Sequence, residues 1–323
     1  MAEIQYMTLS TKLTAKLSYT FHPPTTPTPP PTTPKLLVFL NGLGLPQTSW
    51  FPAITQLQES HSHSPSLPSI LTYDRYGQGQ SDRDPDDANA QDPSHGHDCM
   101  AVVSDLRQLI SQIAAENLGI NESQTDKIQL IFVANSIGCA IARLYAQTYT
   151  STVAGMLLLD SVLANSDFVS VYPDPDDAEF DPSLLPSGIT ASDIRTEREG
   201  VRKIFHPSVG SKEGLSRSNL PDLLPSSSSP KLTGPNGGTW ITVVGHDPEA
   251  FVEESSRMGR VRELTGKYVN PFWRKYNEGL VQLTEEGRGK GPVIAEGAGH
   301  FVQRDRPDFV VGELIEILGK VRE

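Results

Sequence analysis

The sequence predicts an α/β protein with a mostly parallel central sheet, helices on both faces of the sheet and one irregular insertion. Three observations support this class. Short apolar runs alternate with longer amphipathic segments, which is the order that strands joined by right-handed crossover helices produce. The apolar run 128–133 leads almost directly into Ser136 and then into a helical pattern. A later apolar run, 293–295, leads into a glycine-rich loop that carries His300.

The elements follow from the local pattern along the chain. Alternating apolar and polar residues over 7–21 predict an opening pair of antiparallel strands. Residues 23–34 are only Pro and Thr, which predicts an extended surface connector, with a docking segment for another protein as the alternative. Further strands are expected at 36–40, 70–73, 128–133, 156–159, 240–244 and 293–295. Helices are expected at 100–115, 138–148 and 280–286.

The regular alternation stops between residues 164 and 235. This stretch contains acidic turns and clusters of Pro, Ser and Gly, and its amphipathic part 189–205 predicts a helix. A second unusual stretch, 266–276, concentrates aromatic residues. We interpret these aromatics first as packing residues, and Phe272, Trp273 or Tyr276 as candidates for lining a substrate cavity.

The composition fits a soluble enzyme of the cytoplasm. The chain has 323 residues, of which 37% are hydrophobic, enough for one large domain with an insertion. Its net charge of −12 argues against nucleic acid or an anionic membrane as partner, because both require clustered Lys and Arg. No signal-peptide pattern or run of ~18 apolar residues occurs, so neither secretion nor a membrane span is expected. Only Cys99 and Cys139 occur, which excludes a disulfide framework and suits a reducing compartment.

Ser136 lies in a small-x-Ser-x-Gly turn between the apolar run and the helical pattern. This order is typical of a nucleophile elbow, whose strained corner lifts the serine hydroxyl out of the sheet. The backbone N–H of Ile137 would then point to where an oxyanion forms. Ala134 and Gly138 fit, since larger side chains there would collide with the neighbouring strand and helix. The pattern therefore predicts that Ser136 is a nucleophile.

His300 ends the loop Gly297-Ala-Gly-His, which follows an apolar run. Pro307 comes soon after it and opens the last amphipathic segment, where its missing N–H is harmless. Loops at the carboxyl ends of the strands are where catalytic groups gather in α/β sheets. His300 is therefore the candidate general base.

Four blocks together resemble the α/β-hydrolase family over nearly the whole chain, namely residues 37–44, 74–81, the Ser136 turn and the His300 loop. The resemblance implies the α/β-hydrolase fold, with a core of residues 1–162 and 236–323 and a cap or lid of residues 163–235 inserted after the sixth strand. It also implies that Leu43 and Ile137 donate the oxyanion hydrogen bonds. Asn41 and Gly42, where the family usually has His-Gly, become candidates for substrate contact, and 74–81 is interpreted as scaffold.

The acid that completes a catalytic triad has two candidates. Asp247 follows the strand 240–244, close to where the family places its carboxylate, although only His246 separates it from the glycine. Asp160 ends the strand 156–159, and some family members place the acid there. We favour Asp247 and keep Asp160 as the alternative.

The resemblance implies a serine hydrolase that cleaves an ester, lactone or thioester of a medium-sized hydrophobic molecule through an acyl-enzyme. A serine nucleophile excludes the haloalkane dehalogenase and epoxide hydrolase chemistry of this fold, which needs a carboxylate. Two alternatives remain open: a carbon–carbon hydrolase, lyase or cyclase using the same residues, and a non-catalytic receptor. We expect no cofactor and no metal, because His95 and His97 have no Cys or Glu partner at ligand-like spacing.

Overall fold

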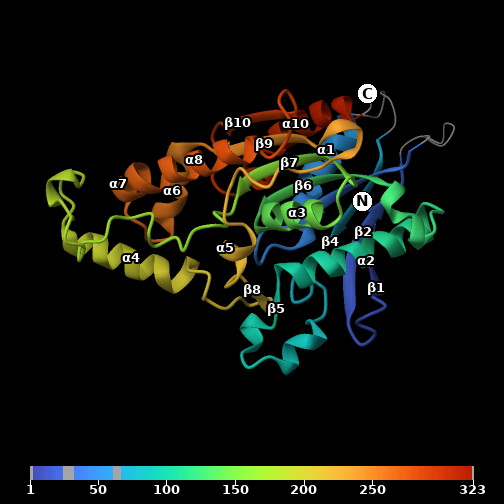
Figure 1. Ribbon diagram of the computed structural model, residues 1–323, viewed down its shortest axis with the longest axis horizontal. Coiled ribbons are helices and arrows are strands. Elements are labelled where there is room, and N and C mark those ends of the chain that lie inside the picture. The colour runs from blue at the N-terminus through green and yellow to red at the C-terminus, as the bar shows by residue number, and fades with distance from the viewer. Residues whose placement is uncertain (1–2, 25–32, 61–66, 322–323) are drawn as a thin grey trace.

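The computed structural model describes residues 3–24, 33–60 and 67–321, so most of the Pro/Thr segment lies outside the described residues. One eight-stranded sheet forms the centre of the protein (Figure 1), with the strands in the order β1-β2-β4-β3-β6-β7-β9-β10. The strands β1 and β2 pair antiparallel, as do β2 and β4, and the other pairs are parallel. Their bounds are β1 (Gln5–Thr8), β2 (Lys16–His22), β3 (Lys35–Leu40), β4 (Ser69–Tyr73), β6 (Gln129–Ser136), β7 (Val153–Ser161), β9 (Trp240–His246) and β10 (Gly289–Ala295). The α/β class and the opening antiparallel strands are confirmed.

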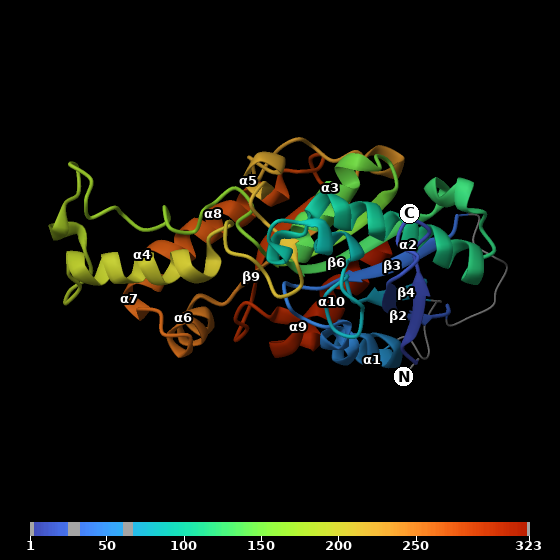
Figure 2. The same ribbon diagram turned by 90° about the horizontal axis from the view of Figure 1, so that it is seen from below.

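Helices cover both faces of the sheet (Figures 1 and 2) because alternate residues of its strands point to opposite sides. On β3, Leu36, Val38 and Leu40 pack in one apolar cluster, and Leu37 and Phe39 pack in the other. The first cluster includes residues of α2 (Cys99–Asn117), α3 (Ile137–Thr148) and α8 (Asn270–Val281). The second includes residues of α1 (Phe51–Ser60), α9 (Val302–Asp305) and α10 (Pro307–Lys320).

The predicted helix over 280–286 is wrong. The helix α8 begins at Asn270, with Pro271 in its first turn, and ends at Val281. The aromatic segment is therefore itself helical, and Leu280 and Leu283 are buried at and just beyond its end. Their apolar spacing marked the end of α8 and the turn after it rather than a new helix.

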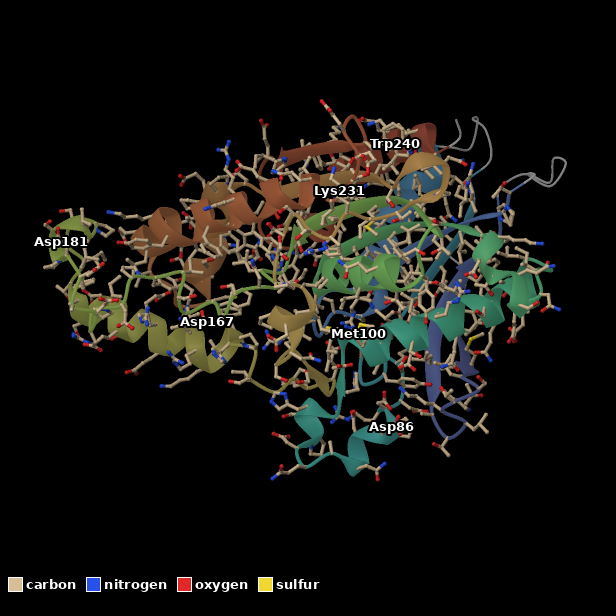
Figure 3. The ribbon with its side chains drawn as sticks, in the orientation of Figure 1. Asp86, Met100, Asp167, Asp181, Lys231 and Trp240 are labelled. Carbon is tan, nitrogen blue, oxygen red and sulfur yellow. The ribbon has the colours of Figure 1, made fainter. Side chains whose placement is uncertain are left out.

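The predicted amphipathic helix, α4 (Ala191–Phe205), projects from the sheet (Figure 1). A third apolar cluster packs beside it. Figure 3 places Asp181 at the far end of this projection. The cluster combines Tyr172 and Val201 from the insertion with Leu264 from a later segment. That later segment holds α6 (Pro248–Arg257), α7 (Arg262–Leu264) and the π-helix η7 (Thr265–Val269).

The rest of the insertion returns to the core. The short strand β8 (Leu215–Ser216) pairs with β5 (His97–Asp98), and α5 (Leu220–Leu223) follows it. The apolar cluster beside α4 therefore combines two separate stretches of sequence, one within the insertion and one that contains α7 and η7. Short 3-10 helices complete the description: η1 (Gln47–Trp50), η2 (Pro85–Asn89), η3 (Pro93–His95), η4 (Glu122–Lys127), η5 (Pro182–Leu184) and η6 (Pro235–Gly237).

Candidate active site

Ser136 stands at the corner where β6 passes directly into α3, with φ 55° and ψ −121°. A non-glycine residue in this region is strained by about 1–3 kcal/mol, so the surrounding packing must hold it there. Gly138 explains how the corner fits, since a Cβ on it would lie 2.4 Å from the Leu40 carbonyl oxygen. The local sequence therefore produces the strained turn that the pattern predicts.

The loop after β3 passes close to Ser136. A Cβ on Gly42 would lie 3.5 Å from Ser136 Cβ, and the next residue, Leu43, lines the same cavity as Ser136 and Ile137. Arg75 fixes this loop by donating to the carbonyl oxygens of Asn41 (2.7 Å) and Gly42 (3.0 Å). A buried guanidinium thus holds the backbone of this loop beside Ser136.

Arg75 also pairs with Glu213 across 3.1 Å, and both side chains are buried. Glu213 accepts from Gly44 N–H as well, at 3.4 Å. The 74–81 turn is therefore structural, as interpreted, and Arg75 is in addition the clamp of the adjacent loop. Sequence reasoning missed Glu213, whose neighbours in the chain carry no motif.

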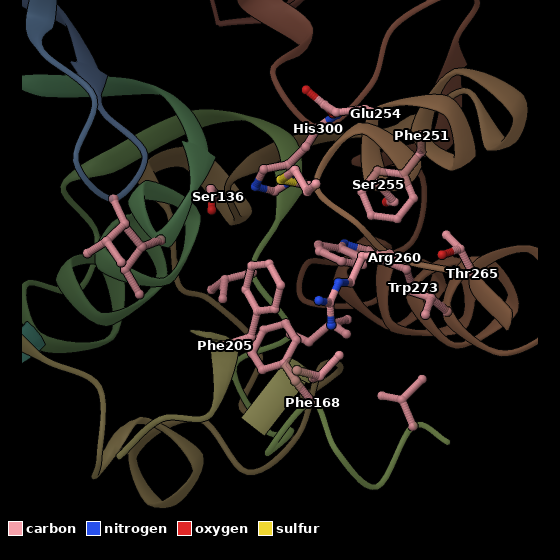
Figure 4. A pocket seen from close by; sticks show the side chains of 18 of the residues that line it. Ser136, Phe168, Phe205, Phe251, Glu254, Ser255, Arg260, Thr265, Trp273 and His300 are labelled. Atoms are coloured by element: carbon pink, nitrogen blue, oxygen red, sulfur yellow. The ribbon is translucent and has the colours of Figure 1, made fainter. Parts of the chain in front are cut away.

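His300 Nδ1 donates to Asp160 Oδ2 at 2.6 Å, and in Figure 4 the His300 ring points toward Ser136. Asp160 lies in β7 and is fully buried. Burial alone would raise the pKa of Asp160, but the hydrogen-bonded rings of His246 and His300 lower it to about 2. A carboxylate that stays ionised fixes the proton of His300 on Nδ1 and leaves Nε2 as the basic nitrogen.

Asp247, the acid favoured from the sequence, is engaged elsewhere. It is the N-cap of α6 and accepts from the backbone N–H groups of Glu249 (2.9 Å) and Ala250 (3.3 Å). Its other oxygen accepts from Gly297 N–H at 3.0 Å, which holds the start of the histidine loop. The carboxylate that contacts the histidine ring is Asp160, so the structure corrects the preference for Asp247.

Asp160 serves two histidines. His246 Nδ1 donates to Asp160 Oδ1 at 2.9 Å, and His246 Nε2 lies 3.2 Å from the Asn270 side-chain oxygen. Asn270 donates through its amide nitrogen to Pro248 O, which fixes the direction of that amide. Both nitrogens of His246 therefore face acceptors. Although burial lowers the pKa of His246, the charge and hydrogen bond of Asp160 raise it overall, so the contacts favour the imidazolium.

The side chains of buried Asn135 and half-buried Glu254 hold the backbone of His300. Asn135 Nδ2 donates to the His300 carbonyl oxygen at 3.0 Å, and His300 N–H donates to Glu254 Oε2 at 2.7 Å. Gly299 permits this approach, because a Cβ there would lie 2.3 Å from Glu254 Oε2. No sequence motif marks Glu254, which is one of several acidic residues on α6.

The cavity in front of Ser136 has a volume of about 260 Å³ and is lined mainly by apolar and aromatic side chains (Figure 4). Trp273 lines it, and its ring lies 5.5 Å from the His300 ring. Phe272 instead is 38% exposed on the outside of α8. Among the other lining residues are Leu163, Phe168, Tyr172, Val201, Phe205 and Phe251.

Asn41 is buried, and both ends of its amide are used within the protein. It donates to Tyr73 O (2.8 Å) and Gln78 Oε1 (3.0 Å) and accepts from Trp50 Nε1 (2.8 Å). Its candidacy for substrate contact is therefore corrected to a structural role. The carbonyl oxygen of Gly42 accepts from Arg75 and Gln78. What Gly42 contributes to the site is the lack of a side chain, which lets the loop pass close to Ser136.

One group in the described part of the chain could offer three metal ligands, namely Asp84, Asp87 and His97. Lys12 already forms an ion pair with Asp84 at 2.6 Å, and His97 Nδ1 donates to Asp87 at 2.8 Å. These ligand atoms of Asp84, Asp87 and His97 are therefore already paired within the protein. Within the described residues, no helix combines the length and apolar character needed to cross a bilayer.

Residues 37–313 match the alpha/beta hydrolase family. Among solved structures, a mutant epoxide hydrolase of Vigna radiata is 12% identical with a TM-score of 0.55, covering 99% of both chains. The enol-lactonase of Burkholderia xenovorans is 18% identical with a TM-score of 0.52, covering 98% of this chain and 100% of the other. A thermophilic esterase of Thermogutta terrifontis is 17% identical with a TM-score of 0.51 and full coverage of both chains. A search of curated proteins finds no match.

Proposed function

Since this chain belongs to the α/β-hydrolase family, we propose that it is a serine hydrolase whose triad is Ser136, His300 and Asp160. The observation that carries the proposal is the hydrogen bond of 2.6 Å from His300 Nδ1 to the buried Asp160, next to a serine held in the strained elbow conformation. The fold alone is shared with enzymes of several activities, so the residues at the site carry the argument.

The chemistry follows from these positions. With its Nδ1 proton held by Asp160, His300 accepts the Ser136 proton at Nε2 while Ser136 Oγ attacks the substrate carbonyl. The N–H groups of Leu43 and Ile137 stabilise the oxyanion, and each such donor typically contributes about 3 kcal/mol to the transition state. The leaving group takes the proton from His300, and water then releases the acyl-enzyme by the same steps.

The cavity indicates the class of substrate. A volume of about 260 Å³ with mainly apolar walls suits the acyl or alcohol part of a medium-sized hydrophobic ester, lactone or thioester. Epoxide hydrolases of this fold use a carboxylate nucleophile, and position 136 holds a serine. A serine at this position therefore supports acyl transfer rather than epoxide opening.

The test uses a fluorophosphonate probe and a series of p-nitrophenyl esters. We expect the wild-type chain to be labelled and to turn over the esters, and Ser136→Ala to lose labelling and ~10⁶ in turnover with an unchanged melting temperature. Ser255→Ala is the matched control, because Ser255 lines the same cavity and has no place in the mechanism. Labelling that persists in Ser136→Ala, or a wild-type chain that is neither labelled nor active, would contradict the proposal and favour a binding protein.

A further inference from the structure

Arg260 brings a guanidinium into the mainly apolar cavity. It lies between α6 and α7, and Figure 4 shows its side chain reaching into the cavity, apart from Ser136, in the direction of Phe168 and Phe205. Its Nε and Nη1 atoms are buried and have no hydrogen-bond partner among the residues that the structure describes. A buried donor that stays unpaired is costly, so these N–H groups favour a ligand that can accept from them.

The protein balances this charge only loosely. Glu197 on α4 faces Arg260, but the distance from Arg260 Nη1 to Glu197 Oε1 is 3.8 Å, which is too long for a hydrogen bond. Glu197 is 4% exposed, and burial raises the pKa of its carboxyl. The ion pair therefore keeps Arg260 in place without using up its donors.

Two other charged residues line the cavity, and both are engaged within the protein. Arg217 also lines the cavity, and its guanidinium donates to the carbonyl oxygens of Phe205, His206 and Val209 rather than to a carboxylate. Glu254 lines the cavity too and forms an ion pair at 2.8 Å with Arg304, which also pairs with Asp305.

Gly200 gives the guanidinium its space. A Cβ at this position of α4 would lie 2.5 Å from Arg260 Nη1 and 2.9 Å from Nη2. Glycine inside a helix is unfavourable compared with alanine. Here it allows the Arg260 head group to lie against the helix, so the position of that head group is built into the cap.

We propose that Arg260 is an anion-binding subsite, and that the natural substrate carries a carboxylate at the end remote from the bond that is cleaved. A planar guanidinium with free N–H groups matches a carboxylate through paired charge-assisted hydrogen bonds. The proposal rests on the serine hydrolase function, since it places the scissile carbonyl at Ser136 and the carboxylate at Arg260. It names the substrate class as an acid-terminated hydrophobic ester, lactone or thioester.

The first test compares p-nitrophenyl esters of fatty acids with the p-nitrophenyl half-esters of dicarboxylic acids of the same length, in a series from succinate to suberate. We expect wild type to prefer at least one half-ester in kcat/KM, and Arg260→Gln to lose about 10- to 100-fold on it, mainly through KM, as for a charge-assisted hydrogen bond. The fatty-acid esters should change by less than about twofold under the same substitution. Arg257→Gln, on the exposed end of α6, is the matched control.

Glu197→Gln separates this role from a structural one. Without the competing carboxylate, Arg260 should bind the half-esters several-fold more tightly, which is opposite to the effect of Arg260→Gln. If the ion pair served only to hold the cap together, both substitutions would weaken activity toward all esters. Equal losses on charged and neutral esters in both variants would overturn the proposal. If Arg260→Gln does not fold, Arg260→Lys, which keeps the charge but loses the fork, replaces it and should retain part of the preference.

A binding measurement distinguishes failure of the subsite from failure of the proposed function. In the Ser136→Ala background, calorimetry with monomethyl and dimethyl dicarboxylates of the same lengths needs no turnover. Preference for the monomethyl acid that disappears in Arg260→Gln supports the subsite even if no ester is hydrolysed by the wild-type chain. Equal binding of the two ligands overturns the subsite even if the esters are good substrates.

Discussion

Asp160→Asn should cripple the enzyme while Asp247→Asn should not. An asparagine at 160 has one carbonyl oxygen, whereas the carboxylate now accepts from His300 through one oxygen and from His246 through the other. One histidine must therefore face an amide NH₂, and the negative charge that stabilises the His300 imidazolium is lost in either case. We expect turnover to fall by about 10³ to 10⁴, the loss typical of removing the orienting carboxylate of a triad.

The same substitution should change stability in a defined way. The pKa of Asp160 is about 2 in the folded chain against the usual 3.8, a difference that corresponds to about 2 kcal/mol of stability at neutral pH. Asn at position 160 lacks that contribution and leaves the imidazolium of His246 beside a neutral group. Asp247→Asn keeps a good N-cap residue and loses only the contact of a carboxylate with Gly297 N–H, so a smaller loss of stability is expected.

The assay is p-nitrophenyl ester turnover, measured together with urea unfolding so that both variants are compared as folded protein. Asp160→Asn should show the low turnover at temperatures where its unfolding curve still shows a native baseline. The reasoning is refuted if Asp247→Asn is the inactive variant and Asp160→Asn keeps more than about a tenth of the wild-type turnover.

Two further predictions concern stability. The pKa of Asp160 is depressed, so its contribution to stability is present above pH 4 and is lost as the pH falls toward 2. The pKa of His246 is raised, so its contribution to stability is present below pH 6.5, its usual pKa, and is lost as the pH rises above that value. The free energy of unfolding should therefore decline at both ends, and in the Asp160→Asn variant urea titrations at each pH should show less decline at the acid end. Gly138→Ala should destabilise the chain by at least about 2 kcal/mol, because the new Cβ would lie 2.4 Å from the Leu40 carbonyl oxygen. Gly312 is an exposed position of α10, and a Cβ there would meet no atom within 4 Å, so Gly312→Ala should stabilise the chain by up to about 1 kcal/mol. Equal thermal shifts for the two alanine variants would contradict the close approach at Leu40.

The sequence by itself determined the features that depend on neighbours in the chain. The strand, small-x-Ser-x-Gly turn and helix around Ser136 are local, because an apolar run that ends at a serine and restarts with helical spacing leaves one way to pass from sheet to helix. The glycine-rich loop before His300 is local in the same sense. Alternation of strands and helices then fixed the class of fold, since parallel strands need crossover connections.

Only the tertiary structure decided which carboxylate meets His300. The strands β7 and β9 are neighbours in the sheet and end at the same edge, so Asp160 and Asp247 are both delivered to the vicinity of the histidine loop. The choice depends on the backbone at each strand end: Asp160 has φ 42° and directs its carboxylate at two histidine rings, whereas Asp247 caps α6. The capping role of Asp247 does have a local signal, because Asp followed by Pro, here Pro248, is a common start of a helix. Asn41, Glu254 and Arg260 contact Gln78, His300 and Glu197, which lie 37 or more residues away in the sequence. No local pattern encodes such contacts, because they form only when separate segments pack together.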